Sequence, residues 1–449
     1  MLIPFAALAA VALALAGDEH ETEVREFEYR SDGVRCRLTW TGPTTGWRLQ
    51  TAAADGTFAD AGAVQKLAAF MDEPAPSSAI PFKVGEKDGV RVCRADDGTR
   101  LELAADGVLR VVSSSGKTVT EVTAVSVSGG KASLAGRLLE AEPVYGLGER
   151  LDQLNKRGQK LSIFTSDGYN NSSATYMAIP LFTTHRGGGV FVNLYERMTA
   201  DFGATEKNVW RFEVDKPQID AYLFAKDRIP DALAAYTELS GHADEPEPWN
   251  MGPVICRYYP DLTRFEGSFV CKFRGMTLRG HGLKDMMERH IALGVKPSAV
   301  IVEGGGFVDL HSKQEKRAEL RRMAEYLREK DIKLMLYMRM GGVCSQKAPG
   351  YRRDFNVSVS ISTNGVECIA DTKRIPDRWS KGINPDVRGS RAHEEADITD
   401  PAFWDWYVNT VWRDLIDMGV RGVKIDFCEL MSEEGENPGG VGVHYKWKD

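Results

Sequence analysis

The chain has 449 residues, a length that typically corresponds to two or three domains. Hydrophobic residues make up 43% of it and charged residues 27%, a balance that excludes a disordered or collagen-like chain. Acidic residues outnumber basic ones by 64 to 57, for a formal net charge of −7, and no block of basic residues stands out. Because nucleic-acid binding needs a basic patch, we expect no nucleic-acid partner.

The amino terminus is an uncharged run rich in alanine and leucine, from Leu2 to Ala16, followed by Gly17. It is shorter than the ~20 apolar residues that a membrane-spanning helix needs. An apolar run that ends in a small-x-small pattern is typical of a secretory signal peptide. We therefore predict a signal peptide over residues 1–16, a secreted or extracytoplasmic protein and no membrane partner. A short anchor and a buried helix are the alternatives.

The cysteines give no sign of a metal site. They show no CxxC pair and no cysteine–histidine spacing of the kind that binds zinc, so we predict no metal and no cofactor. In an oxidising compartment some of them can pair, whereas their wide spacing fits buried reduced thiols equally well. The pairing stays open for all seven: Cys36, Cys93, Cys256, Cys271, Cys344, Cys368 and Cys428.

Residues 17–227 have the pattern of short strands. Polar and apolar residues alternate in several runs, and Asp-Gly pairs such as Asp97-Gly98 and Asp106-Gly107 separate them, which is typical of antiparallel hairpins. Many short strands within ~200 residues predict a large β-sandwich. The clearest runs are Val34–Trp40, Val90–Arg94, Arg100–Leu103, Val108–Val112 and Gly187–Asn193.

The pattern changes in residues 228–250, which we predict to be a linker. Asp231–Ser240 is predicted to be a short helix that Gly241 ends, and the proline-rich segment Glu245–Trp249 follows it.

Residues 251–449 alternate between apolar runs and amphipathic segments, which predicts βα units and a parallel sheet. The predicted strands are Gly252–Cys256, Ser298–Val302, Ile332–Tyr337 and Gly422–Phe427, and the predicted helices are Gly282–Leu293, Gln314–Lys330 and Pro401–Met418. A closed (β/α)8 barrel needs eight such units and the sequence has about four. We therefore expect the first half of a barrel, truncated at its C-terminal side, and keep an open sheet as the alternative.

The last predicted strand carries two charged residues on one face. Side chains alternate along a strand, so Val423, Ile425 and Phe427 share the face toward the helices, whereas Lys424 and Asp426 share the other. Barrel enzymes place their catalytic groups at the carboxyl ends of strands. A lysine nearby lowers the pKa of a carboxyl group, and an ionised carboxylate can attack the anomeric carbon of a sugar. A structural ion pair is the alternative.

Two groups of motifs resemble glycoside hydrolase family 31, the retaining α-glycosidases. The first is Tyr145-Gly-Leu-Gly-Glu-Arg150, with Lys156–Gln159 and Pro180–Asn193 after it. The second is Asp397–Pro401 with the tryptophans that follow, and then Gly419-Val-Arg-Gly-Val-Lys-Ile-Asp-Phe-Cys-Glu429. The resemblance extends from about residue 140 to the end. It implies a galactose-mutarotase-like β-sandwich that leads into a (β/α)8 barrel, here incomplete.

The resemblance also implies roles for individual residues. Asp426 matches the family nucleophile, Lys424 a residue that binds sugar in the −1 subsite, and Glu429 a residue that supports the following loop. The general acid/base of the family lies beyond the end of this chain, so we expect the 449-residue fragment itself to be inactive.

Two strand ends depart from the usual family pattern. Glu303 is the expected partner of a sugar hydroxyl, although Gly304–Gly306 follow it, and Arg339 is expected to contact a polar or anionic group on the sugar. Asp167, in a loop, is expected to reach the aglycone side, with a plain Asp-Gly turn as the alternative. These departures leave the identity of the sugar open.

We therefore predict hydrolysis of terminal α-glycosidic bonds with retention, through a glycosyl-enzyme intermediate on Asp426, and an oligosaccharide or glycoside as the substrate partner. A catalytically inactive sugar-binding homologue is one alternative. A transglycosylase or lyase on the same scaffold is another, because the nucleophile would be shared. The sequence does not predict the linkage or the oligomeric state.

Overall fold

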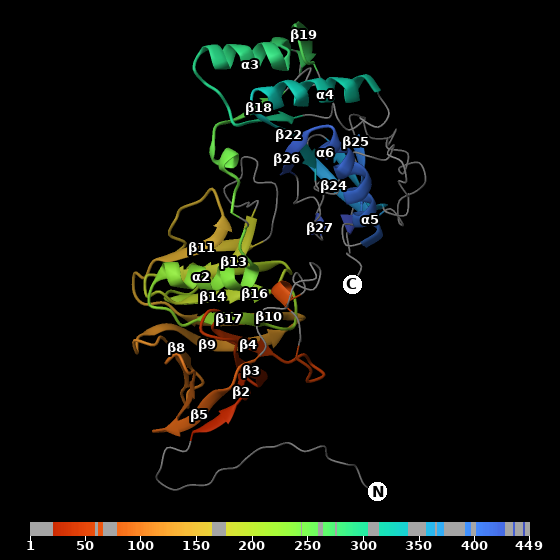
Figure 1. Ribbon diagram of the computed structural model, residues 1–449. Helices are drawn as coiled ribbons and strands as arrows, with labels where there is room; N and C mark the ends of the chain where they lie inside the picture. The colour runs from red at the N-terminus through yellow and green to blue at the C-terminus, as the bar shows by residue number, and fades with distance from the viewer. Residues whose placement is uncertain are drawn as a thin grey trace. The chain divides into compact units, whose positions relative to one another are not determined.

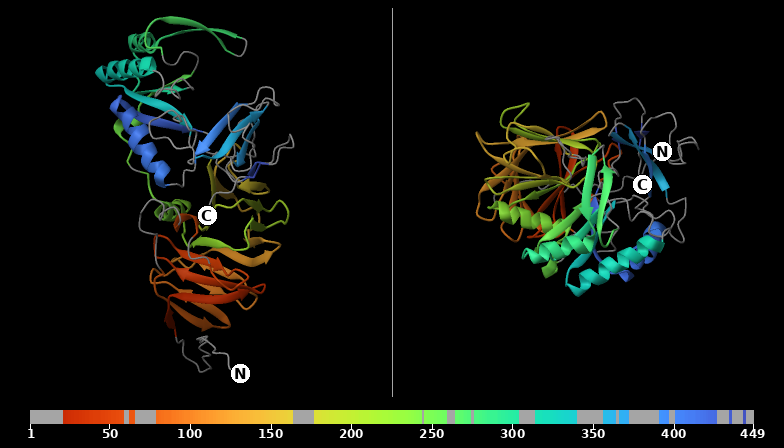
Figure 2. Two further views of the ribbon diagram at one scale, coloured as in Figure 1. Left: turned by 90° about the vertical axis from the view of Figure 1, so that its right-hand side faces the viewer. Right: turned by 90° about the horizontal axis from the view of Figure 1, so that it is seen from above.

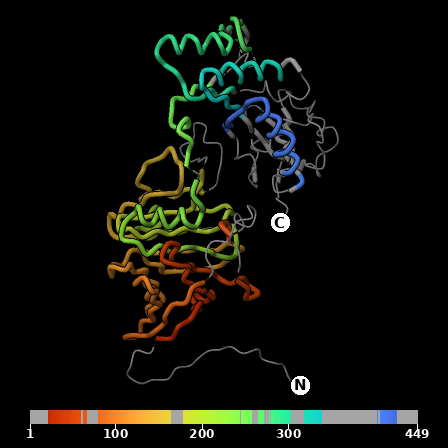
Figure 3. The backbone as a smooth tube through the Cα atoms, viewed as in Figure 1, coloured from red at the N-terminus to blue at the C-terminus, as the bar shows by residue number. Residues whose placement is uncertain are grey.

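The computed structural model describes residues 21–58, 62–65, 79–163, 177–243, 245–258, 264–273, 276–303, 314–339, 356–363, 366–371, 391–396, 401–426, 434–435 and 443–444. The predicted signal peptide lies outside these residues. The chain divides into two compact units, one made of Met1–Phe164 with Gly168–His242 and the other of Thr165–Asp167 with Ala243–Asp449. The boundary at residue 242 falls inside the segment predicted to be a linker. Figure 3 traces both units by residue number.

The first unit contains two antiparallel sheets (Figure 1). The seven-stranded sheet has the order β11 (Val144–Glu149), β13 (Met177–Thr184), β14 (Gly189–Val192), β17 (Asp220–Phe224), β4 (Trp47–Thr51), β3 (Val34–Trp40) and β2 (Glu26–Ser31). The ten-stranded sheet has the order β1 (Thr22–Val24), β5 (Phe82–Lys87), β6 (Val90–Arg94), β7 (Arg100–Leu103), β8 (Leu109–Val112), β9 (Thr118–Ser128), β10 (Lys131–Arg137), β16 (Val209–Val214), β15 (Met198–Phe202) and β12 (Lys160–Ile163).

One hydrophobic core joins the two sheets, as the sequence predicts for a β-sandwich. Leu49 and Phe182 from the seven-stranded sheet and Trp210 and Phe212 from the ten-stranded sheet are completely buried in it. The rings of Phe182 and Trp210 have centroids 5.1 Å apart, so the aromatic contacts cross between the sheets. Strands β3, β6 and β7 have the predicted bounds, and β8 begins one residue later than predicted.

Helix α2 (Ile229–Ser240) covers the outer face of the seven-stranded sheet (Figure 1). Its residues Ala232 and Leu239 are buried against Tyr222 and Phe224 of β17, while the alternate β17 residue Leu223 belongs to the core between the sheets. Both faces of β17 are therefore covered, which explains why the strand is buried throughout. The predicted linker thus begins with a helix that packs as part of the first unit.

The second unit is built on a parallel sheet (Figure 2). Its order is β18 (Val254–Tyr258), β21 (Ala299–Glu303), β22 (Lys333–Arg339) and β26 (Val420–Asp426). Helices α3 (Leu283–Ala292), α4 (Gln314–Glu329), α5 (Pro401–Trp406) and α6 (Arg413–Asp417) lie between these strands in sequence, and a π-helical segment over Tyr407–Trp412 joins the last two. The segment predicted as one helix, Pro401–Met418, is therefore interrupted.

Parts of the second unit differ from the prediction. The hairpin of β19 (Ser268–Phe273) and β20 (Met276–His281) follows β18, and an antiparallel sheet of β23 (Asn356–Thr363), β24 (Val366–Asp371) and β25 (Arg391–Ala396) follows β22. Two short strands, β27 (Glu434–Gly435) and β28 (Val443–His444), and the 3₁₀ turn Pro248–Met251 complete the described elements. Within the described residues the parallel sheet has edges at β18 and β26, so they do not form a closed (β/α)8 barrel.

Candidate active site

The carboxyl ends of the four parallel strands bring the predicted site positions to one edge of the sheet. Glu303 is the last residue of β21 and pairs in register with Tyr258, the last residue of β18. Arg339 is the last residue of β22 and pairs in register with Asp426, the last residue of β26. Because the strands are parallel, all four residues lie at the edge where α/β proteins bind ligands.

The two faces of this sheet have different environments. Val300, Leu334 and Leu336 are buried in a hydrophobic cluster with residues of α3, α4 and α6, and Val423 packs against the same cluster. The face of β26 that carries Val423 is therefore the helix face, as the alternation predicts. Lys424 is half-buried on the opposite face, and Asp426 follows it by two positions, so the pleat of the strand places both residues on the same side.

Gly422 lies two residues before Lys424 on the same face of β26. A Cβ atom at this position would lie 3.0 Å from Cγ of Met335 and 3.3 Å from Cη2 of Trp249. The indole of Trp249 and the thioether of Met335 therefore occupy the space beside the glycine, one row below Lys424. Glycine is the residue that allows this close approach without displacing either neighbour.

Lys424 has an aromatic neighbour on the adjacent strand. Tyr337 of β22 pairs in register with Lys424 of β26, and the Lys424 Nζ atom lies 5.4 Å from the centroid of the Tyr337 ring. Both side chains are half-buried. This separation is within the range of a cation–π interaction. Tyr337 was not predicted as a site residue from the sequence, although its position two residues before Arg339 places it on the same face of the strand as the predicted site.

The predicted site residues are described to different extents. For Glu303, Arg339 and Asp426 the structure gives the backbone, which places Arg339 beside Asp426 and Glu303 two strands away from β26. Lys424 is described with its side chain. Asp167 and Glu429 lie outside the described residues.

The motif Tyr145–Arg150 contains a bulge in the pairing of β11 with β13. The register between β11 and β13 shifts between Gly146 and Gly148, and Gly146, Leu147 and Gly148 all have positive φ angles, of 127°, 70° and 80°. Leu147 is completely buried in the sandwich core despite this conformation, which is uncommon for a residue with a side chain. The two glycines allow β11 to approach the backbone of β13 closely, which accounts for their presence in the motif.

The bulge leads into a loop that buried charges hold in place. Arg150 Nε donates a hydrogen bond of 2.8 Å to Asp152 Oδ2, and Lys156 Nζ donates a hydrogen bond to Asp152 Oδ1. Burial raises the pKa of the Asp152 carboxyl, but the hydrogen bonds and charges of Lys156 and Arg150 outweigh this effect, so its pKa is lower than usual. The carboxylate therefore stays ionised and fixes the loop.

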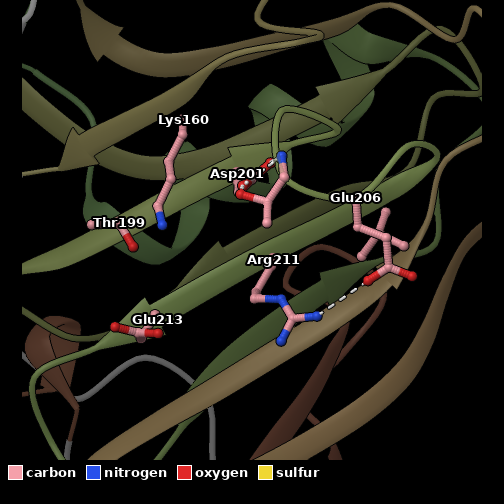
Figure 4. A pocket seen from close by; sticks show the side chains of 8 residues that line it. Lys160, Thr199, Asp201, Glu206, Arg211 and Glu213 are labelled. Carbon is pink, nitrogen blue, oxygen red and sulfur yellow. Dashed lines mark hydrogen bonds and ion pairs between the residues drawn. The ribbon is translucent and has the colours of Figure 1, made fainter.

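The ten-stranded sheet carries a polar cavity of about 300 Å³ on strands β12, β15 and β16 (Figure 4). Two of its charged side chains have partners in the fold: Asp201 accepts a 2.8 Å hydrogen bond from the backbone N–H of Ala204, and Arg211 lies 3.6 Å from Glu206. A second cavity, of about 460 Å³, includes Lys333 and Arg421 at the amino ends of β22 and β26. It lies at the end of the sheet opposite the predicted site.

The described ranges contain no group of three or more His, Cys, Asp or Glu residues arranged to hold a metal ion. None of the helices in these ranges combines the length and the apolar character that a membrane span requires.

The fold and the site together define a β-sandwich followed in sequence by a parallel βα unit with charged residues at its carboxyl edge. The model of the glycosyl hydrolase 31 N-terminal galactose mutarotase-like domain matches residues 48–201, from β4 into β15. Alpha-xylosidase XylQ of Lactiplantibacillus pentosus is 24% identical over 304 residues, which cover 66% of this chain and 36% of XylQ. Alpha-glucosidase 2 of Bacillus thermoamyloliquefaciens is 32% identical over 126 residues, or 26% of this chain and 16% of that enzyme.

The likeness also holds for the three-dimensional structure. The GH31 dextranase FjDex31A of Flavobacterium johnsoniae, solved in complex with isomaltotriose, aligns with a TM-score of 0.67 and 16% identity. The alignment covers 91% of this chain and 47% of the dextranase. The chain therefore spans less than half the length of XylQ and of this solved relative. Residues 48–201 are therefore similar to the N-terminal domain of glycoside hydrolase family 31, and the fold is similar to that of a GH31 dextranase.

Proposed function

We propose that this chain supplies the sandwich and the nucleophile of a retaining α-glycosidase, with Asp426 as the nucleophile. The observation that carries the proposal is the register of β22 and β26, which sets Asp426 beside Arg339 at the carboxyl edge and above the row of Tyr337 and Lys424. The match of residues 48–201 to the glycosyl hydrolase 31 N-terminal domain and the relatives named as α-xylosidase and α-glucosidase support glycoside hydrolysis as the reaction.

In this mechanism a carboxylate oxygen of Asp426 bonds to the anomeric carbon while the bond from that carbon to the leaving oxygen breaks. The positive charge of Lys424 keeps the carboxylate ionised and binds a sugar hydroxyl. Glu303 and Arg339 contact other groups of the same sugar, Asp167 reaches the aglycone, and Glu429 supports the loop after the strand. A second carboxyl group protonates the leaving oxygen, as retention requires.

We further propose that the parallel sheet forms part of a (β/α)8 barrel. In such a barrel the face that carries Lys424 points inward, and the carboxyl ends of the strands surround the pocket. The fold likeness to the dextranase over 91% of this chain supports the proposal. The substrate is then an oligosaccharide or a smaller α-glycoside whose terminal sugar enters the pocket.

The test uses an activated sugar whose fluoride leaving group departs without acid catalysis. With a 5-fluoro-α-xylosyl or 5-fluoro-α-glucosyl fluoride, an Asp426 oxygen bonds to the anomeric carbon, the carbon–fluorine bond breaks and fluoride departs with the electron pair. The second fluorine slows hydrolysis of the ester, so the sugar stays attached. We expect peptide mass spectrometry of the protein, as its gene encodes it, to find the sugar on Asp426. A sugar found on another residue would overturn the assignment.

Turnover and product analysis with the same protein distinguish hydrolysis from related functions. Asp426→Ala is expected to abolish turnover of nitrophenyl α-glycosides, because no ester can form. Free sugar as the product indicates hydrolysis, whereas transferred or unsaturated sugar indicates a transglycosylase or a lyase. Sugar binding without labelling or turnover in the unaltered protein would identify a binding protein and contradict the proposed activity.

A further inference from the structure

Tyr337 and Lys424 form a defined pair between the adjacent strands β22 and β26. They are register partners on neighbouring parallel strands, and the lysine Nζ lies 5.4 Å from the ring centroid. The neighbouring residue Leu336 is buried in the helix-side cluster, so the alternation of β22 places Tyr337 on the face that also carries Lys424. The pair therefore lies one row before the carboxyl edge, where Arg339 and Asp426 are in register.

The ammonium group of a lysine keeps a fixed position only when neighbouring groups hold it. Its four-carbon stem has many rotamers, and its ammonium group is a compact point charge. An aromatic ring attracts the ammonium group through its negative face and limits the volume that the group visits. On the other side of Lys424 along β26, the glycine at 422 leaves room for Trp249 and Met335, which occupy the row below.

We propose that Tyr337 is a positioning residue that holds the Lys424 ammonium next to Asp426. This inference rests on the proposed role of Asp426. Residues 424 and 426 are two positions apart on one strand, about 6.7 Å by the rise of a β-strand. With the ammonium held by the ring, its positive charge lies beside the attacking carboxylate and the oxygens of the bound sugar. Without the ring, the lysine keeps its charge but loses one of the contacts that direct its ammonium group.

This role depends on the ring of Tyr337, so two substitutions distinguish it from packing. Tyr337→Phe keeps the ring face, and Tyr337→Leu replaces it with an apolar group of smaller size and no π-face. A matched control exists in the same unit: Tyr326 of α4 has Lys330 Nζ 5.8 Å from its ring centroid, but it is buried in the helix-side cluster. Tyr326→Leu therefore removes a similar pair on the opposite side of the sheet.

The experiment measures how fast the 5-fluoro-α-glycosyl fluoride labels Asp426, at several probe concentrations, in the protein as its gene encodes it. We expect Tyr337→Leu to lower the maximal labelling rate about fivefold, within the range of a partly desolvated cation–π contact, with a smaller change in the half-saturating concentration. Tyr337→Phe is expected to keep the maximal labelling rate near that of the unaltered protein, and Tyr326→Leu is expected to leave this rate unchanged. Equal urea midpoints for the two Tyr337 variants exclude misfolding as the cause.

The outcomes separate this inference from the proposed function. If Asp426 is labelled and Tyr337→Leu reacts as fast as the unaltered protein, Tyr337 has no positioning role although the nucleophile assignment stands. The same conclusion follows if Tyr337→Phe is as slow as Tyr337→Leu. If the unaltered protein is labelled at another residue, the nucleophile assignment fails, and the inference about Tyr337 fails with it.

Discussion

Glu142 is a carboxylate without solvent exposure in the sandwich, and its charge is balanced by Arg186. The Arg186 Nε atom donates a 2.7 Å hydrogen bond to Glu142 Oε1, Arg186 Nη2 donates one of 3.2 Å to Oε2, and the Leu139 backbone N–H donates one of 2.7 Å. Burial raises the pKa of Glu142, but the hydrogen bonds from Arg186, Leu139 and Thr184 outweigh it and lower the pKa below the usual value. The pair is therefore ionised at neutral pH.

Replacing Glu142 with glutamine is expected to destabilise the sandwich strongly at neutral pH. The substitution leaves the Arg186 guanidinium buried without a counter-charge, which typically costs about 3–5 kcal/mol. Urea unfolding followed by proteolysis of the sandwich measures the change. The matched control is Glu140→Gln, because Glu140 is exposed and its contact with Lys207 is a surface pair. A control that shifts the urea midpoint as much as Glu142→Gln would contradict the argument.

The pH dependence of the same variant has a definite sign. A carboxyl group whose pKa is lower in the folded than in the unfolded state stabilises the fold above its unfolded pKa, and this contribution is lost as the pH falls through the folded pKa. The difference in free energy of unfolding between the unaltered protein and Glu142→Gln is therefore expected to shrink below about pH 4.5. A difference that grows on acidification would show that Glu142 does not have a lowered pKa.

The bulge in the pairing of β11 with β13 depends on a glycine, which has no Cβ atom. A Cβ atom on Gly148 would lie 1.9 Å from the carbonyl oxygen of Met177 on β13, and the φ angle of Gly148 is 80°. The pairing of β11 with β13 therefore excludes any side chain at this position. Gly158 has nearly the same φ angle, 79°, but a Cβ atom there would meet no atom within 4 Å.

Alanine substitutions at these two glycines distinguish the cost of backbone strain from the cost of a steric clash. Gly158→Ala is expected to cost about 1 kcal/mol, because alanine disfavours a positive φ angle. Gly148→Ala has the same cost plus that of displacing β13, and we expect more than about 3 kcal/mol in total. The free energy of unfolding of the sandwich in urea measures both. Equal losses would show that β11 and β13 can move apart without penalty.

Sequence patterns predict local structure well in this chain and long-range pairing poorly. The strand Val34–Trp40 and the helix beginning at Gln314 have the predicted positions, because alternation and helical periodicity are local signals. The packing of α2 on the seven-stranded sheet was not predicted, since the face that it covers joins β17 to Leu181 of β13 and Phe191 of β14 through strand pairing that leaves no local signal. The hairpin β19–β20 was missed because a short exposed hairpin carries little apolar periodicity.

The same limit applies to the candidate site. The alternation of β26 correctly separates Val423 on the helix face from Lys424 on the other face. The pairing of Lys424 with Tyr337 was not predicted, because the relative shift of two parallel strands is set by the connection between them and leaves no local signal. The roles of Asp426, Arg339, Glu303, Asp167 and Glu429 stay predictions.

Each of the two units has its own hydrophobic core. Leu49 is completely buried in the core between the sheets of the sandwich, and the smaller cluster under α2 also consists of residues from the first unit. Leu334 is buried in the cluster that joins the parallel sheet to its helices, all from the second unit. Because cooperative unfolding follows the continuity of a core, the two units have separate sources of stability.

We therefore expect two unfolding transitions that single substitutions move separately. Leu49→Ala removes buried methyl groups from the sandwich core and Leu334→Ala from the parallel unit, and each is expected to cost about 2–5 kcal/mol in its own unit. Hydrogen exchange of peptides from each unit, measured along a urea titration, distinguishes the two transitions. The Leu49→Ala change is expected to lower the midpoint for peptides before residue 242 alone, and Leu334→Ala for peptides after it. A single transition that both substitutions shift equally would mean that the units unfold as one, because the stability of each core would then depend on the other.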